Sequence, residues 1–280
     1  MSNPMVNFTT PEASTNSTTQ SIGILDGLNI CVYSIGFLFG LPSQSYIIWL
    51  IITRTANGVA TELFILNLSA CEIGICLNYF LYALSYLFLH LSTLKLFFLG
   101  LSITGRPLFQ CLICVERYLA VVHPVTFLKY KPLRYRVICC AAAWIIIIGS
   151  CFWCLFTTVS NNIACIWILS MQFLIFFSIQ LFCLVAVLIA LKQSGPGERA
   201  RERGEENHMK RRAFYLILVT TVSMAIIYGP YIIIGFLTIV INEFLHPLWL
   251  IAFICYIVAG LVNPVLYLHR TGKLSCLRLP

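Results

Sequence analysis

Charged residues are scarce in this sequence. Asp, Glu, Lys and Arg make up only 10% of the 280 residues, whereas a soluble domain carries about a quarter. Hydrophobic residues account for 60%, and the mean hydropathy is +0.91. So little polar surface cannot coat a water-soluble globule, and we therefore expect membrane lipid to surround most of the chain.

Several signatures of other protein classes are also missing. No predicted helix carries His and Glu at metal-binding spacing, and there is no Gly-x-Ser-x-Gly turn, so we expect neither an enzyme nor a metal or other cofactor. The first twenty residues lack the basic and apolar segments of a cleaved signal peptide. Most of the 13 cysteines lie in apolar runs, where they serve as small buried hydrophobes. They include Cys71, Cys76, Cys111, Cys114, Cys139, Cys140, Cys183 and Cys255.

Long apolar stretches are present instead, and each reaches the ~20 residues that a helix needs to cross a bilayer. They fall near residues 28–52, 63–88, 93–122, 137–157, 166–191, 213–241 and 248–268. The pattern predicts an all-α bundle of seven transmembrane helices over residues 28–269. It is preceded by a tail at 1–27 and followed by a short tail at 270–280, and a hydrophilic linker at 193–212 joins the fifth and sixth helices.

The basic residues predict the orientation of this bundle. Sixteen of the 18 Lys and Arg residues lie on the side opposite the amino terminus, and cytoplasmic loops carry such an excess. The amino terminus is therefore expected outside the cell, where Asn7 and Asn16 are glycosylation sequons. The net charge of +8 reflects topology and does not indicate a nucleic-acid partner. The sixteen are Arg54, Arg117, Lys129, Lys131, Arg134, Arg136, Lys192, Arg199, Arg201, Arg203, Lys210, Arg211, Arg212, Arg270, Lys273 and Arg278.

Short motifs end the third and seventh predicted helices. The third closes with Glu116-Arg117-Tyr118, and the seventh with the run from Asn263-Pro264 to Tyr267. Trp144 lies in the fourth helix and Pro230 in the sixth. Together, at these depths, the motifs resemble those of rhodopsin-like (class A) G-protein-coupled receptors over residues 28–276. Gly40-Leu41-Pro42-Ser43-Gln44 and His123-Pro124 look most like the branch of purinergic, lipid and proteinase-activated receptors.

The resemblance implies how the motifs work. Glu116 would neutralise Arg117 while the cytoplasmic mouth is closed. When the sixth helix swings out on the bend at Pro230, Arg117 would meet the carboxyl-terminal helix of a heterotrimeric G protein. Asn263-Pro264 would loosen the seventh helix, so that Tyr267 rotates inward. Lys210 stands where an acidic latch for Arg117 is expected, and the closed state would therefore rest mainly on Glu116.

Glu72 and Arg106 are charged residues deep within predicted spans. Glu72 lies ten residues from Glu62, and Arg106 lies eleven from Arg117. At ~1.5 Å per residue both sit roughly 15 Å above the cytoplasmic end, on neighbouring helices. Because a lone charge at this depth costs several kcal/mol, we expect the two to pair. The resemblance places Glu72 at a sodium-binding position of the family, so a guanidinium would replace the ion.

Other positions depart from the family pattern. Cys165 lacks a cysteine partner near Ser92, which predicts that the usual outer disulfide is missing. Taken together, the remaining substitutions are unfavourable for efficient signalling. Tyr228 stands for a Trp, Leu188 for a Tyr, Gln180 for a Pro and Gln44 for an Asn.

The outer cavity is expected to be apolar, which suits a lipid-like or small apolar ligand; the alternative is ordinary packing without a ligand. At the other end, Cys276 follows basic residues and is a candidate for palmitoylation. The leading hypothesis is a plasma-membrane receptor that signals to a G protein. The alternatives are an atypical receptor that signals weakly and a transporter that uses the Glu72–Arg106 pair. The predicted lining is Phe98, Leu99, Tyr231, Ile234, Phe253 and Ile257.

Overall fold

A computed structural model describes residues 24–53, 62–85, 88, 91–130, 133–160, 162–192, 200–241, 246–260 and 264–265. Within these ranges the chain is almost entirely helical. The helices are α1 (Ile24–Thr53), α3 (Leu63–Ser85), α4 (Ser92–Gly100), the short π-helix η2 (Leu101–Gly105), α5 (Arg106–Val122), α6 (Pro124–Tyr130), α7 (Leu133–Ser160), α8 (Asn162–Lys192), α9 (Ala200–Ile241) and α10 (His246–Gly260).

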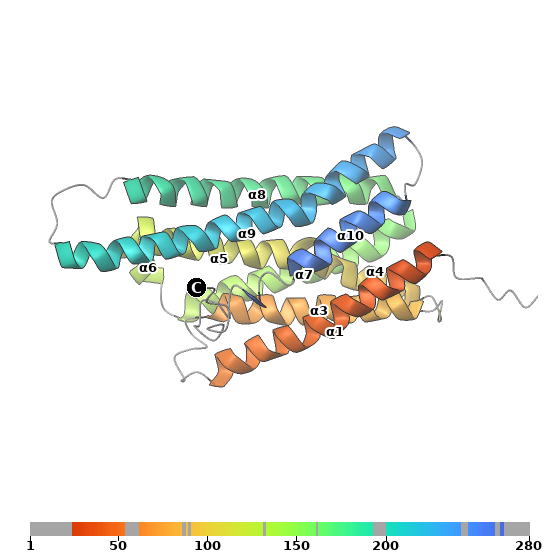
Figure 1. Cartoon of the computed structure of the whole chain (residues 1–280), viewed down its shortest axis with the longest axis horizontal. Coiled ribbons are helices and arrows are strands. Elements are labelled where there is room, and N and C mark those ends of the chain that lie inside the picture. Colours follow the sequence, from red (N-terminus) through yellow and green to blue (C-terminus); the bar gives the residue numbers. More distant parts are fainter. Residues whose placement is uncertain are drawn as a thin grey trace, which may run out of the picture.

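The long helices lie side by side along the long axis of the molecule, as Figure 1 shows. Six spans of the described residues are long and apolar enough to cross a membrane; α4, η2 and α5 together form one of them. The seventh helix is α10, with a shorter apolar core at Leu248–Val258. The predicted seven-helix bundle is thereby confirmed, and residues 261–263 and 266–268 of the predicted last helix lie outside the described residues.

The part of the predicted linker at 200–212 forms the first turns of α9 instead. The reason is visible in its charge spacing. Arg201 and Glu205, and likewise Glu206 and Lys210, lie four residues apart, and opposite charges at this spacing stabilise a helix. The hydrophilic composition predicted a linker here, but the spacing of the charges favours a helix.

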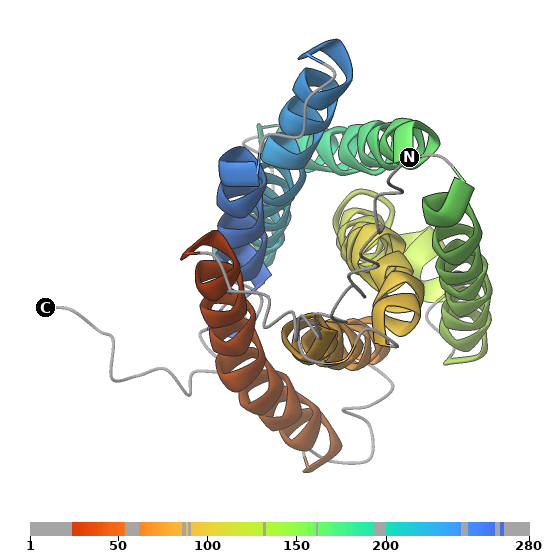
Figure 2. The ribbon, with the colours of Figure 1, turned by 90° about the vertical axis from the view of Figure 1, so that its right-hand side faces the viewer.

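The continuous span of α4, η2 and α5 is the central helix of the bundle. In the end-on view of Figure 2 the other helices surround it. In its most apolar window 72% of the residues are buried, against 17% for α8. Large apolar side chains point outward from the surrounding helices, such as Ile145, which is 72% exposed. Lipid tails would cover these side chains, and they need no protein partner.

Close packing between helices relies on small residues. A Cβ atom on Gly100 would lie 2.4 Å from the Cα of Cys151, so α4 and α7 approach each other at a distance that only glycine permits at that position. The core of the bundle includes Phe109, Ile147 and Met224, all fully buried. The two described ends of the bundle are called the Arg117 end and the Ile24 end below.

Candidate functional site

The Glu72 and Arg106 side chains meet in the centre of the bundle. Glu72 lies on α3 and Arg106 at the first position of α5, and they are 2% and 1% exposed. Arg106 Nε donates to Glu72 Oε1 at 2.5 Å, and Arg106 Nη2 donates to Glu72 Oε2 at 2.7 Å. Both carboxylate oxygens thus bind one guanidinium in a parallel fork, the arrangement in which two buried opposite charges compensate each other best.

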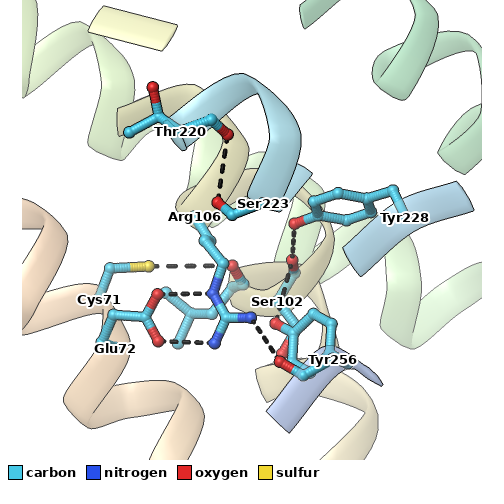
Figure 3. Close-up of polar contacts among 9 residues, drawn as sticks. Cys71, Glu72, Ser102, Arg106, Thr220, Ser223, Tyr228 and Tyr256 are labelled. Atoms are coloured by element: carbon cyan, nitrogen blue, oxygen red, sulfur yellow. Dashed lines mark hydrogen bonds and ion pairs between the residues drawn. The ribbon is translucent and has the colours of Figure 1, made fainter. Parts of the chain in front are cut away.

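The guanidinium also contacts α10, as Figure 3 shows. Arg106 Nη1 donates to the Tyr256 carbonyl at 3.4 Å, and its Cζ lies 4.1 Å from the centre of the Tyr256 ring. On the same helix, a Cβ atom on Gly260 would come within 2.9 Å of Arg106 Nη2. The absence of a side chain at Gly260 therefore makes room for the cation, and Arg106 links three helices.

The residues around Glu72 do not fit a sodium ion. Both oxygens of Glu72 accept hydrogen bonds from Arg106, so the guanidinium already neutralises the carboxylate that would attract a sodium ion. The positive charge of Arg106 lies against this carboxylate, and a second cation there would be repelled.

At the Arg117 end the structure differs from the expected Glu116–Arg117 contact. Glu116 Oε1 lies 2.5 Å from Arg136 Nη2 on α7, and both side chains are 10% exposed. Consecutive residues on a helix point in different directions, so Glu116 and Arg117 do not face each other. Among the described residues the buried Nε of Arg117 has no hydrogen-bond partner. The expectation that Glu116 neutralises Arg117 was therefore wrong, and Arg136 is the residue that sequence reasoning missed.

Tyr118, the third residue of the motif, turns toward the end of α5. Its hydroxyl lies 3.1 Å from His123 Nε2, and its ring packs edge-on against Phe182 of α8. Pro230 lies within α9 and is half-buried. Pro264 is buried in a short helical piece.

Asn263 and Tyr267 lie outside the described residues, as do Asn7, Asn16 and Cys276, and so do the side chains of Ser92, Cys165 and Lys210.

Of the residues expected to line an outer cavity, most take part in packing near the Ile24 end. Tyr231 is edge-on to Phe253 and Trp249, with ring centres 5.6 Å and 5.8 Å apart. Ile234 and Ile257 are buried, Phe98 packs edge-on against Phe97, and Leu99 is half-buried.

The aromatic cluster extends to side chains that the prediction omitted, from α1, α3 and α10. Tyr79 and Tyr82 stand three residues apart on α3, a spacing that places both on one helix face and that could have indicated the cluster. The omitted members are Tyr33, Tyr79, Tyr82 and Tyr256.

The substituted family positions fall in different surroundings. Gln180 is fully buried on α8, and neither polar atom of its side chain has a hydrogen-bond partner within the described part of the chain. Gln44 is buried on α1, whereas Leu188 is 38% exposed on the outside of α8. Tyr228 is buried, and its hydroxyl binds the carbonyl of Ser102.

The long apolar helices of the fold define a multi-pass helical membrane protein. Comparison with known families specifies the class. The family model described as 7 transmembrane receptor (rhodopsin family) matches residues 44–267, so the chain belongs to the rhodopsin family of G-protein-coupled receptors.

Individual relatives are identical to this chain at about a quarter of the aligned positions. The C-C chemokine receptor type 8 of Homo sapiens is 24% identical over 245 residues, covering 74% of this chain and 62% of that receptor. The Chemokine XC receptor 1 of Mus musculus is 27% identical, covering 85% of this chain and 77% of the relative. The Leukotriene B4 receptor 1 of Bos taurus is 29% identical over 149 residues, covering 50% of this chain and 41% of the relative. The chain thus spans less than two thirds of the length of the first of these relatives.

Proposed function

We propose that the protein is a plasma-membrane receptor that passes an extracellular signal to a heterotrimeric G protein. In this proposal the Arg117 end faces the cytoplasm, because most Lys and Arg residues of the chain belong to the segments at that end. The Ile24 end and the glycosylatable tail at 1–27 face the outside. Membership of the rhodopsin family supports the proposal.

The observation that carries the proposal is the state of Arg117. It lies near the end of the central helix, where α5 packs against α8 and α9. The neighbouring carboxylate is already engaged by Arg136, and Arg117 Nε has no hydrogen-bond partner among the described residues. An arginine held in this way needs no ion pair to be broken within the Glu116-Arg117-Tyr118 motif before it meets a G protein. We therefore expect measurable signalling without added ligand.

Basal activation of a panel of G-protein biosensors in cells tests this function. The wild type should activate at least one G-protein class, and Arg117→Ala should abolish the signal at equal surface expression. Arg134→Ala is the matched control, because Arg134 is an exposed arginine on α7 at the same end. A wild-type signal that survives Arg117→Ala would refute the assigned role of Arg117.

The ligand proposed here is apolar or lipid-like. The side chains near the Ile24 end of α9 and α10 are mainly aromatic and aliphatic, and among the described residues of these two helices there is no Lys or Arg at that end to bind a phosphate. The relatives are named for different ligands, leukotriene B4 in one case and chemokines in others. The choice therefore rests on the chemistry of this chain. Signalling raised by amphipathic lipids but not by nucleotides would support it, and the reverse result would overturn it.

Insensitivity to sodium belongs to the same proposal, because Arg106 supplies the cation that the family takes from solution. Thermal unfolding in detergent should be the same in sodium chloride, lithium chloride and choline chloride at equal ionic strength. A stabilisation found only with sodium would contradict it.

A receptor that folds and reaches the surface but signals weakly is the second candidate. Leu188 favours it, because the position that would carry an activating tyrosine is exposed on the outside of α8. The two candidates differ in the biosensor assay: a silent wild type with normal surface expression supports the second.

A further inference from the structure

The Ser102 carbonyl in the centre of the bundle has lost its place in the helical hydrogen-bond ladder. In an α-helix this oxygen would accept from the N–H of Arg106, four residues on. In η2, however, the Arg106 N–H donates to the Leu101 carbonyl, in the five-residue pattern of a π-helix. In that pattern the donor for Ser102 would be residue 107, which is a proline and has no N–H.

Two tyrosine hydroxyls take the place of the missing donor. Tyr228 on α9 donates to the Ser102 carbonyl at 2.9 Å, and Tyr256 on α10 donates to it at 3.4 Å. Figure 3 shows both hydroxyls converging on this one oxygen. Ser102, Tyr228 and Tyr256 are 7%, 3% and 5% exposed. A backbone carbonyl without a donor is costly in such surroundings, since neither water nor lipid can replace the bond.

Tyr256 joins the Ser102 contact to the buried Glu72–Arg106 pair. The Tyr256 ring and its backbone carbonyl both contact Arg106, and its hydroxyl reaches Ser102. Tyr228 stands two residues before Pro230, next to the point where α9 lacks a backbone hydrogen bond. Movement of α9 at this level would remove the shorter of the two bonds to Ser102.

We propose that the hydroxyls of Tyr228 and Tyr256 form a clamp on the Ser102 carbonyl. This hydroxyl clamp connects α9 and α10 to η2 and holds α9 in the position seen here. The proline that disrupts the central helix creates the acceptor, and two neighbouring helices use it. The clamp acts without a G protein, so it stands or falls separately from the proposed function.

Hydroxyl deletion followed by thermal unfolding of the full chain in detergent tests the clamp. Buried free thiols such as Cys71 and Cys114 report unfolding when they react with a fluorogenic maleimide. Each single change, Tyr228→Phe or Tyr256→Phe, leaves one donor. The double change leaves none, and it should lower Tm by about 2–8 °C, more than the two single shifts together. Tyr79→Phe is the matched control, because the buried Tyr79 hydroxyl has no hydrogen-bond partner among the described residues, and its Tm should not fall.

Restoring the backbone donor distinguishes the clamp from ordinary packing. Pro107→Ala returns an N–H at residue 107, which can serve Ser102 within the helix. In the Pro107→Ala background, the double tyrosine change should lower Tm by no more than half of the decrease that it causes in the wild-type background. A double variant with the same Tm as the Tyr79→Phe control would overturn the proposal. An undiminished decrease in Tm in the Pro107→Ala background would also overturn it.

The position of α9 gives a second readout that holds even where Pro107→Ala does not fold. Spin labels introduced by an unnatural amino acid at Tyr135 of α7 and Tyr215 of α9, both exposed, report the distance between these helices at the Arg117 end. The double tyrosine variant should gain a longer-distance population that the Tyr79→Phe variant lacks. Identical distance distributions in the two would show that the hydroxyls do not restrain α9.

Discussion

Replacing one member of the Glu72–Arg106 pair should destabilise the bundle far more than replacing both. Both side chains are almost completely buried, at 2% and 1% exposure, and they share two hydrogen bonds of 2.5 Å and 2.7 Å. Arg106→Met alone leaves a carboxylate without its counter-charge, and Glu72→Met alone leaves a guanidinium. An uncompensated buried charge costs about 3–5 kcal/mol. At ~2–4 °C per kcal/mol for a chain of this order of size, each single variant should lose roughly 6–20 °C in Tm.

The double variant, Glu72→Met with Arg106→Met, removes both charges and fills the space with flexible apolar side chains. Replacement of a whole buried pair is often neutral or stabilising, and here it also loses the contacts of Arg106 with Tyr256, so we expect a cost below about 2 kcal/mol. The assay is thermal unfolding of all four proteins in one detergent, as a double-mutant cycle. A double variant that loses as much as the two single variants together would refute the reasoning, because it would mean that the two charges do not compensate each other.

Three further predictions concern single contacts. Gly260→Ala should lower the unfolding free energy by about 1–3 kcal/mol, because its Cβ would lie 2.9 Å from Arg106 Nη2. The control Gly149→Ala, whose Cβ would have no atom within 4 Å, should be neutral or stabilising. Equal effects of the two changes on Tm would contradict the packing argument. Arg136→Ala should lower the unfolding free energy by about 1–3 kcal/mol, because Glu116 loses its partner at 2.5 Å. The control Arg134→Ala, which removes an exposed side chain, should cause no measurable change in the same thermal unfolding experiment. A Tm of Arg136→Ala equal to the wild-type value would show that the pair does not stabilise the fold. Trp144→Phe should lower the unfolding free energy by about 0.5–1.5 kcal/mol, because it removes the 2.8 Å hydrogen bond from Trp144 Nε1 to Asn67 Oδ1. This decrease should be smaller in an Asn67→Ala background. An undiminished decrease there would assign the effect to the size of the ring.

The sequence was sufficient to predict the seven helices, because a helix that crosses lipid must be a long run of apolar residues, and such runs can be counted directly along the sequence. Counting along two helices also placed Glu72 and Arg106 at one depth, and the structure has them in contact. In both cases the relevant distance runs along a helix axis, where the rise per residue is constant.

Contacts between helices that are distant in sequence could not be predicted in the same way. Arg136 lies on α7 and Glu116 on α5, with α6 between them in the chain, and nothing in the spacing indicates that the Arg136 side chain contacts that carboxylate. Rotation of each helix about its axis decides such contacts, and side-chain packing sets that rotation. The Ser102 carbonyl is another such case. The sequence analysis did not consider Pro107, and the π-helix and the two tyrosine hydroxyls at this carbonyl follow only from the packed structure.

Nucleotide exchange on purified heterotrimeric G proteins, with the receptor reconstituted in lipid nanodiscs, tests the proposed function most directly. We predict that the wild-type chain accelerates exchange on at least one G-protein class, and that Arg117→Ala reduces the rate to that of empty nanodiscs while Arg134→Ala does not. Equal exchange rates for the wild type, Arg117→Ala and empty nanodiscs across all classes would contradict the account.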